Sequence, residues 1–224
     1  MKKHFEVERW KRSMQDGRKK PQISPGTIAQ AVVEMPWRGQ QSLLEVDQAA
    51  RLPEFLAWHG SRRPMVVSDT TMARSLETFA LKPVRQALWA TAREAQQHAG
   101  MKRKLPSGRK AALALLDGSG WGGFMGSVLA LVGERATVVA GYQMSAGRGH
   151  ELAASRAVLT EARRQLGSGF ADLVVGDGLY MTDEDFRHTR DTCGSHLLVK
   201  TVEETLTVFQ DAKELFFGNP AEMA

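Results

Sequence analysis

The sequence has little of what several common site types require. Its 224 residues include a single cysteine, Cys193, which excludes an internal disulfide and any zinc site built from several cysteines of this chain. The six histidines are scattered and show no obvious metal-ligand spacing. No apolar stretch reaches the roughly 18 uninterrupted residues of a membrane-spanning helix, and the N-terminus is charged. We therefore expect neither a membrane span nor a secretory signal.

What is present suits a globular protein with a mildly basic surface. Hydrophobic residues make up 42% of the chain, enough to bury a sizeable core, and the length allows one or two domains. Thirty lysines and arginines against 25 acidic residues leave a formal charge of +5. This balance favours a nucleic-acid partner without establishing one, because many basic proteins bind no nucleic acid.

Two apolar runs each end on an aspartate followed by glycine. Residues 112–116 run into Asp117-Gly118, and residues 173–176 run into Asp177-Gly178. Short apolar runs bounded by turn residues are typical of strands buried on both faces, although periodicity alone does not exclude a buried helix. If both are strands, each brings a carboxylate to its C-terminal edge.

The surrounding patterns predict the order strand, strand, strand, helix, strand, helix, strand, helix. A break at 133–135 between two strand-like runs indicates a hairpin, helical spacing begins near His150, and Thr182 followed by Asp185 is a helix-capping signature. The expected bounds are strands at 112–116, 123–132, 136–144, 173–176 and 195–200, and helices at 150–166, 182–192 and 202–217.

This order, together with several short segments, resembles the bacterial insertion-sequence transposases of the DDE type. The resemblance spans most of residues 65–217, and its strongest parts are the two Asp-Gly edges and the Gly-Asp-Gly-Leu-Tyr run. The segments that carry it are Val67-Ser68-Asp69-Thr70-Thr71, Leu116-Asp117-Gly118-Ser119, Gly147-Arg148-Gly149-His150-Glu151-Leu152, Val175-Gly176-Asp177-Gly178-Leu179-Tyr180 and Leu198-Val199-Lys200-Thr201.

The resemblance implies a fold, a chemistry and partners. The fold would be α/β (α+β), a ribonuclease-H-like mixed sheet with element order βββαβαβα, preceded by a helical N-terminal module. The activity would be metal-dependent phosphodiester cleavage and strand transfer in DNA transposition, with Mg²⁺ or Mn²⁺ as cofactor. Transposon ends and target DNA would be the partners, with a homodimer or association with a full-length transposase also possible, in a bacterial cytoplasm near the nucleoid.

Paired aspartates have a chemical purpose in such a site. Two divalent ions about 3.5–4 Å apart can activate the attacking oxygen and stabilise the leaving oxygen of a phosphodiester. Carboxylates are the ligands that such hard ions prefer. In a ribonuclease-H arrangement the first and fourth strands are neighbours, so Asp117 and Asp177 would meet and hold the metal ions. The resemblance assigns both residues this catalytic and metal-binding role.

A third acid is expected, and here the sequence departs from the family pattern. The transposases carry a glutamate within a Tyr-Arg-Glu-Lys signature on a later helix, and nothing from Lys200 to Ala224 fits it. Glu203, Glu204 and Glu214 fall on the last predicted helix, but their neighbours do not match. We therefore expect a truncated or frameshifted transposase, or the first portion of a longer one, whose independent catalysis is in question.

The N-terminal half reads as helical and basic. We expect a basic arm at 1–26, a helical module with a basic linker at 27–110, the incomplete catalytic core at 111–217 and a tail at 218–224. Ser68 is a predicted N-cap, Pro83 is expected to open another helix, and Trp89 is expected in the core.

Several cations are candidates for DNA contact. The linker is expected to place its cations beside Asp117, where they would touch the DNA backbone; a solvated charge run explains them nearly as well. Arg148 and Lys200 could also face phosphate, and capping or an ordinary strand-edge lysine are the alternatives. Tyr180 could orient a substrate or pack under the sheet. The linker candidates are Lys102, Arg103, Lys104, Arg109 and Lys110.

Two alternative functions stay open. The segment 115–122 resembles the glycine loop of a Rossmann-type methyltransferase, but its glycines begin immediately after the acid and a second Asp-Gly edge has no place there. A shortened transposase could instead bind DNA without catalysis and inhibit transposition, because attraction to phosphate does not need an intact metal site.

Overall fold

The computed structural model describes residues 7–35, 38–52, 67–97, 99–121, 124–134, 136–145, 147 and 150–200. The chain divides into two compact units, Met1–Ala87 and Leu88–Ala224. The division falls within helix α6 (Leu81–Gln96), so that helix contributes to both units. Among the described residues, no helix combines the length and the apolarity needed to cross a bilayer.

The first unit is a small helical cluster. It contains α1 (Val7–Ser13), α2 (Pro25–Glu34), α3 (Leu43–Ala49) and α5 (Asp69–Glu77). Ile28, Val46 and Met72, one from each of α2, α3 and α5, are almost completely buried in its core. Ser68 caps α5 as the sequence predicts, with its hydroxyl accepting the backbone N–H of Thr71, and Ser24 and Ser42 cap α2 and α3 in the same way. Local capping and one apolar stripe per helix account for this unit.

The second unit is built on a mixed sheet. Its strands are β1 (Lys102–Lys104), β2 (Lys110–Trp121), β3 (Phe124–Val132), β4 (Thr137–Met144), β5 (Leu173–Gly176) and β6 (His196–Val199). The order across the sheet is β4-β3-β2-β5-β6, with β1 paired to β2 off this path. The first three strands of that order form an antiparallel meander, whereas β5 lies parallel to both β2 and β6. This is the ribonuclease-H-like topology, which confirms the expected fold class.

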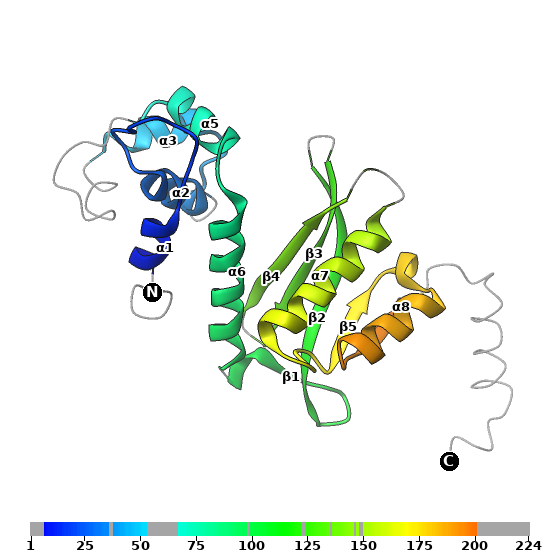
Figure 1. Cartoon of the computed structure of the whole chain (residues 1–224). Helices are drawn as coiled ribbons and strands as arrows, with labels where there is room; N and C mark the ends of the chain where they lie inside the picture. The colour runs from blue at the N-terminus through cyan, green and yellow to red at the C-terminus, as the bar shows by residue number, and fades with distance from the viewer. Residues whose placement is uncertain are drawn as a thin grey trace, which may run out of the picture. The chain divides into compact units, whose positions relative to one another are not determined.

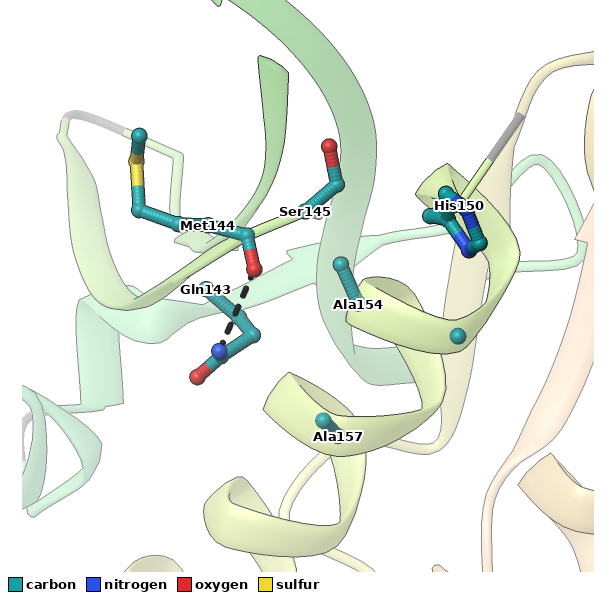
Figure 2. Close-up of a pocket in the computed structure, with 7 residues that line it drawn as sticks. Gln143, Met144, Ser145, His150, Ala154 and Ala157 are labelled. Atoms are coloured by element: carbon teal, nitrogen blue, oxygen red, sulfur yellow. Dashed lines mark hydrogen bonds between the residues drawn. The ribbon is translucent and has the colours of Figure 1, made fainter. Parts of the chain in front are cut away.

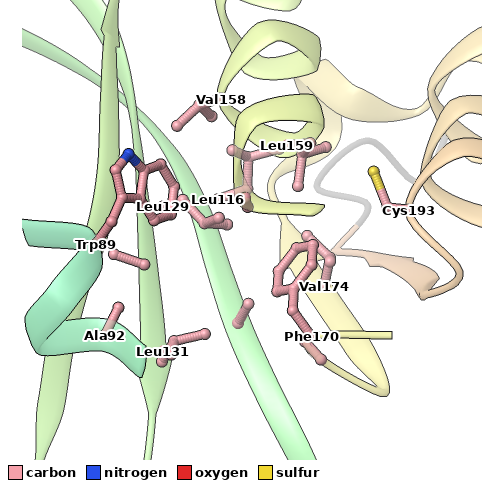
Figure 3. Packing of buried hydrophobic residues seen from close by; sticks show 14 of the residues in the cluster. Trp89, Ala92, Leu116, Leu129, Leu131, Val158, Leu159, Phe170, Val174 and Cys193 are labelled. Atoms are coloured by element: carbon pink, nitrogen blue, oxygen red, sulfur yellow. The ribbon is translucent and has the colours of Figure 1, made fainter. Parts of the chain in front are cut away.

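Helices cover one face of this sheet. Figure 1 shows α7 (Glu151–Leu166) and α8 (Asp183–Arg187) in front of the strands. The short turns η2 (Ala99–Met101), η3 (Gly178–Tyr180) and η4 (His188–Thr192) complete the described elements of the unit. Figure 3 shows Trp89 of α6, Val158 and Leu159 of α7 and Leu129 of β3 meeting in the core. The predicted burial of Trp89 is confirmed, since 4% of its surface is exposed.

The opposite face of the sheet is open among the described residues. Side chains alternate between the two faces along a strand, and Ala114 and Leu116 of β2 point into the core. Leu115, between them, is 43% exposed, and Leu198 on β6 is 54% exposed. Because Asp117 follows the same alternation as Leu115, it lies on this open face.

The structure corrects two local predictions. The segment expected to be a basic linker contains strand β1, whose Lys104 pairs with Lys110 of β2 across a hairpin turn. Strand β2 also does not end at Asp117 but continues to Trp121, because β3 goes on pairing with it. The glycines after Asp117 therefore lie in a strand and open no helix, which removes the methyltransferase interpretation. The helix expected at 202–217 lies outside the described residues.

Candidate active site

The register of the two parallel strands brings the predicted aspartates together. Leu113 pairs with Leu173 and Leu115 pairs with Val175, so the pairing joins residues 60 positions apart. The ladder ends at Leu115 and Val175, and Asp117 and Asp177 each follow two residues later, at the same edge of the sheet. Neighbouring strands lie about 4.8 Å apart, and both aspartates are exposed. The two carboxylates thus share the open face at the point where β5 ends.

A lysine occupies the equivalent position at the end of the next strand, β6. Gly176 pairs with Val199 in the parallel ladder between β5 and β6, and one further step in this register leads from Asp177 to Lys200. The backbone N–H of Lys200 donates to the carbonyl of Gly176 at 3.1 Å, which holds this end of β6 against β5. Lys200 is exposed. Across the adjacent strands β2, β5 and β6, the exposed side chains at this edge are therefore two acids followed by a cation.

Asp177 is oriented by the backbone that follows it. Its own backbone is extended, with φ −84° and ψ −178°, and its Oδ1 accepts the N–H of Leu179 at 3.0 Å at the start of η3. One carboxylate oxygen is thereby used locally and the other stays available. Asp117, by contrast, has no hydrogen-bond or ion-pair partner among the described residues. The site combines one restrained carboxylate with one that a ligand is free to orient.

A buried polar layer lies beneath the aspartates, on the covered face. The hydroxyls of Ser127 and Ser155 are 2.6 Å apart, and Ser155 donates to the carbonyl of Glu151 at 2.8 Å. Tyr180 is 1% exposed, and its hydroxyl completes no hydrogen bond of normal geometry with a described residue. Burial raises the pKa of Tyr180; the nearby Asp177 and Asp117 raise it further, and the two serine hydroxyls partly offset this. The Tyr180 hydroxyl is therefore close enough to both aspartates for their negative charges to affect its pKa, although it lies on the opposite face of the sheet.

Sequence patterns missed most of this layer. Ser155 occupies a position of the predicted apolar stripe of α7, but nothing in the sequence pairs it with Ser127. The sequence is compatible with two roles for Tyr180, and the structure shows it packed under the sheet.

The donor set fits a hard divalent cation only in part. Mg²⁺ is commonly bound through one or two carboxylates, with waters and substrate phosphates completing its octahedral shell. Asp117 and Asp177 meet that minimum. Within the described ranges no group of three or more histidine, cysteine, aspartate or glutamate side chains is suited to hold a metal ion. The acids considered for the third position, Glu203, Glu204 and Glu214, lie outside the described residues.

The basic hairpin lies away from the aspartates. Lys102 to Lys104 pair with residues 110–112, and all the cations of this hairpin are exposed. Seven positions of β2 separate Lys110 from Asp117, which corresponds to about 23 Å along the strand. The expectation that these cations sit beside Asp117 is therefore wrong, because the strand carries them to its other end. Arg148 lies outside the described residues.

A shallow groove beside α7 is separate from the aspartates. It has a volume of about 210 Å³ and lies between the end of β4 and the first turns of α7, two strands away from β2 in the sheet (Figure 2). The amide of Gln143 donates to the backbone carbonyl of Met144 at 3.2 Å along its wall. None of the described residues that line the groove is an acid, so they add nothing to the metal-binding set. Its lining consists of Gln143, Met144, Ser145, His150, Ala153, Ala154 and Ala157.

Comparison with known proteins adds little to this geometry. No protein-family model matches the chain, and no curated protein matches it. Among solved structures, RNase H1 from the halophilic archaeon Halobacterium salinarum NRC-1 is similar at 16% identity and a TM-score of 0.24. That similarity covers 50% of this chain and 98% of the archaeal protein. A likeness this low carries no argument, so the ribonuclease-H-like fold rests on the strand order and directions described above.

Proposed function

We propose that this protein is a DNA transposase of the DDE type, in which Asp117 and Asp177 hold divalent metal ions for phosphodiester cleavage and strand transfer. The observation that carries the proposal is the register between β2 and β5, which leads to adjacent positions for two exposed aspartates 60 residues apart in sequence. Neither aspartate is neutralised by an ion pair with a described residue. Two such carboxylates on one sheet face are what divalent-metal chemistry on phosphate requires.

Each side chain has a distinct role in this proposal. Asp177, restrained by the Leu179 N–H, presents one oxygen in a fixed direction, whereas Asp117 adjusts to the ligand. Bound divalent ions would activate the attacking oxygen and stabilise the leaving oxygen of the phosphodiester. Lys200, next in the row, would attract a phosphate of the bound strand to the open face. The open face leaves room for a nucleic acid, because no described helix of the second unit covers it.

The number of acids decides whether this chain acts alone. The described residues bring two acids together, whereas the transposases that the sequence resembles use three. We propose that the remaining acid comes either from the chain beyond Lys200 or from a second transposase chain. Metal binding and catalysis therefore have to be measured separately, since two carboxylates can bind an ion weakly without supporting turnover.

The test combines Mn²⁺ calorimetry with nicking of a labelled DNA duplex. We expect wild-type protein to bind Mn²⁺, and Asp117→Asn and Asp177→Asn to lose most of that binding and any Mn²⁺-dependent nicking. Asp172→Asn is the matched control: Asp172 lies at the opposite end of the same strand pair, where it accepts the N–H of Ala112 at 2.7 Å. If Asp172→Asn lowers Mn²⁺ binding as much as the other two variants, or if wild type binds no Mn²⁺, the assignment is wrong.

A second function, DNA binding without catalysis, is favoured by the hairpin. Its exposed strand cations lie about 17–23 Å along β2 from Asp117, because they pair with residues 110–112, so they can attract phosphate whether or not metal is bound. Such a protein would occupy transposon ends, or associate with a full-length transposase, and inhibit transposition. Two results together would support this function over the first. The protein would bind a duplex in EDTA in a salt-sensitive way, and it would not nick DNA in Mn²⁺ even when the duplex carries transposon ends.

A further inference from the structure

Tyr180 packs against Gly176 of β5 and lies near Gly118 of β2, next to the two residues that are the proposed metal ligands. A Cβ built on Gly176 would lie 2.5 Å from Cδ2 of the Tyr180 ring, so the ring presses directly on that glycine. A Cβ built on Gly118 would lie 3.8 Å from the Tyr180 hydroxyl, at ordinary van der Waals distance. Gly176 comes immediately before Asp177, and Gly118 comes immediately after Asp117. The side chain therefore reaches from β5 to β2 beneath the two acids.

The absence of a side chain at Gly176 makes the contact possible, whereas Gly118 would leave room for a Cβ. Successive residues of a strand point to opposite faces, so the glycines face the helices while the aspartates face the open side. Any residue larger than glycine at 176 would collide with the ring. The backbone N–H of Tyr180 also lies 3.2 Å from the carbonyl of Asp177, which ties the tyrosine to the strand end by a tight turn.

Packing of the ring is the main contact that positions Tyr180. Its hydroxyl completes no hydrogen bond of normal geometry with a described residue although the side chain is 1% exposed. An aromatic ring has a fixed length and only two side-chain torsions, so it holds its neighbours at a defined separation. A flexible or shorter apolar side chain could fill part of the space without holding that separation.

We propose that Tyr180 is a positioning residue that sets the separation of Asp117 and Asp177 from behind the sheet, and thereby sets the affinity of the pair for a divalent cation. This inference rests on the proposed metal-binding role of the two aspartates. It adds a role for a residue that contacts neither the metal ion nor the nucleic acid. Residues that orient metal ligands from a second layer commonly change metal affinity by about 10- to 100-fold when they are replaced.

The test measures Mn²⁺ affinity by calorimetry together with thermal unfolding. Tyr180→Leu keeps an apolar side chain but removes the ring, and should weaken Mn²⁺ binding by about tenfold or more. Tyr180→Phe keeps the ring and removes a hydroxyl that has no regular hydrogen bond, so its Mn²⁺ affinity should stay close to that of wild type. Phe170→Leu is the matched control, because Phe170 is 4% exposed in the same core, whereas the atoms nearest to the Cβ positions of Gly176 and Gly118 belong to Tyr180.

The outcomes separate this inference from the proposed function. We expect Phe170→Leu to lower the melting temperature about as much as Tyr180→Leu while leaving Mn²⁺ affinity unchanged. If Tyr180→Leu does not fold, Tyr180→Met, which fills more of the space but lacks rigidity, takes its place. Wild-type affinity in the Leu or Met variant, equal weakening in Phe170→Leu, or a Phe variant as weak as the Leu variant would each overturn the positioning role. No Mn²⁺ binding by wild type would instead overturn the metal site itself.

Discussion

Replacing Asp117 with asparagine should stabilise the metal-free protein. Asp117 and Asp177 carry like charges on strands about 4.8 Å apart, and both are exposed. At about 5 Å, two unit charges repel by about 0.8 kcal/mol in bulk water and by about 3 kcal/mol at an effective dielectric constant of 20. Exposure places this pair near the lower figure. Asp117→Asn removes the repulsion without breaking any hydrogen bond to a described residue, so we expect a gain of about 1 kcal/mol at low ionic strength.

Thermal unfolding followed by circular dichroism measures this gain. In EDTA at low salt, Asp117→Asn should melt about 2–4 °C above wild type. The difference should shrink in 1 M salt, where the Debye length falls to about 3 Å. Added Mn²⁺ should reverse the order, because a ligand present at about 100 times its dissociation constant stabilises the wild type by about 2.7 kcal/mol. The variant, with one carboxylate fewer, should gain much less.

A second aspartate supplies the control for this experiment. Asp172 belongs to the same strand pair, but its carboxylate accepts the Ala112 N–H at 2.7 Å. Removing its charge weakens a charge-assisted hydrogen bond, so Asp172→Asn should be less stable than wild type and should keep its response to Mn²⁺. A lower melting temperature for Asp117→Asn in EDTA, or an undiminished response of that variant to Mn²⁺, would refute the adjacency of the two carboxylates.

Three further predictions test other parts of the molecule. Replacing all three cations of Lys102–Lys104 by glutamine should reduce the slope of log affinity against log salt for duplex DNA by up to about 2.7, and an unchanged slope would exclude the hairpin from the interface. Burial raises the pKa of the Cys193 thiol to about 11, so its alkylation at pH 8 should be slow until the protein unfolds. Stability should also fall as pH rises from about 9 towards 11, because the thiol of the unfolded chain loses its proton first. Rapid alkylation of the native protein would contradict this prediction. Gly141→Ala would put a Cβ 2.5 Å from Cη2 of Trp89 and should lower the free energy of unfolding by about 1–3 kcal/mol, measured by urea denaturation. An unchanged urea midpoint would show that Trp89 moves aside at little cost.

Local signals in the sequence predicted much of the fold. Thr182 caps α8 as expected, with its hydroxyl accepting the N–H of Asp185 at 3.1 Å. Helix α7 ends at Leu166, before Gly167, whose φ of 96° is costly for other residues. These features depend on groups within three or four residues of one another, so the sequence alone contains the information.

The sequence predictions are wrong where pairing with another strand decides whether a segment is a strand and where that strand ends. Asp117 was expected at a strand end because glycines follow it, yet β3 pairs with those glycines and prolongs the strand. The basic segment was expected to be a linker, yet Lys102 to Lys104 gain the edge of β2 as a partner. Neither result follows from composition, because ladder hydrogen bonds override weak local preferences.

The sequence by itself determined the order of the main strands and helices of the sheet unit, the caps at Ser68 and Thr182, and the presence of an acid after each of two apolar runs, because short-range sterics and periodicity control these features. The tertiary structure alone decided that Asp117 and Asp177 follow the paired residues of two neighbouring strands, that the basic hairpin lies at the far end of β2, and that Tyr180 packs under the sheet on the face opposite the acids. Register is a property of two strands packed together, and segments 60 residues apart acquire it only when the sheet closes over its core.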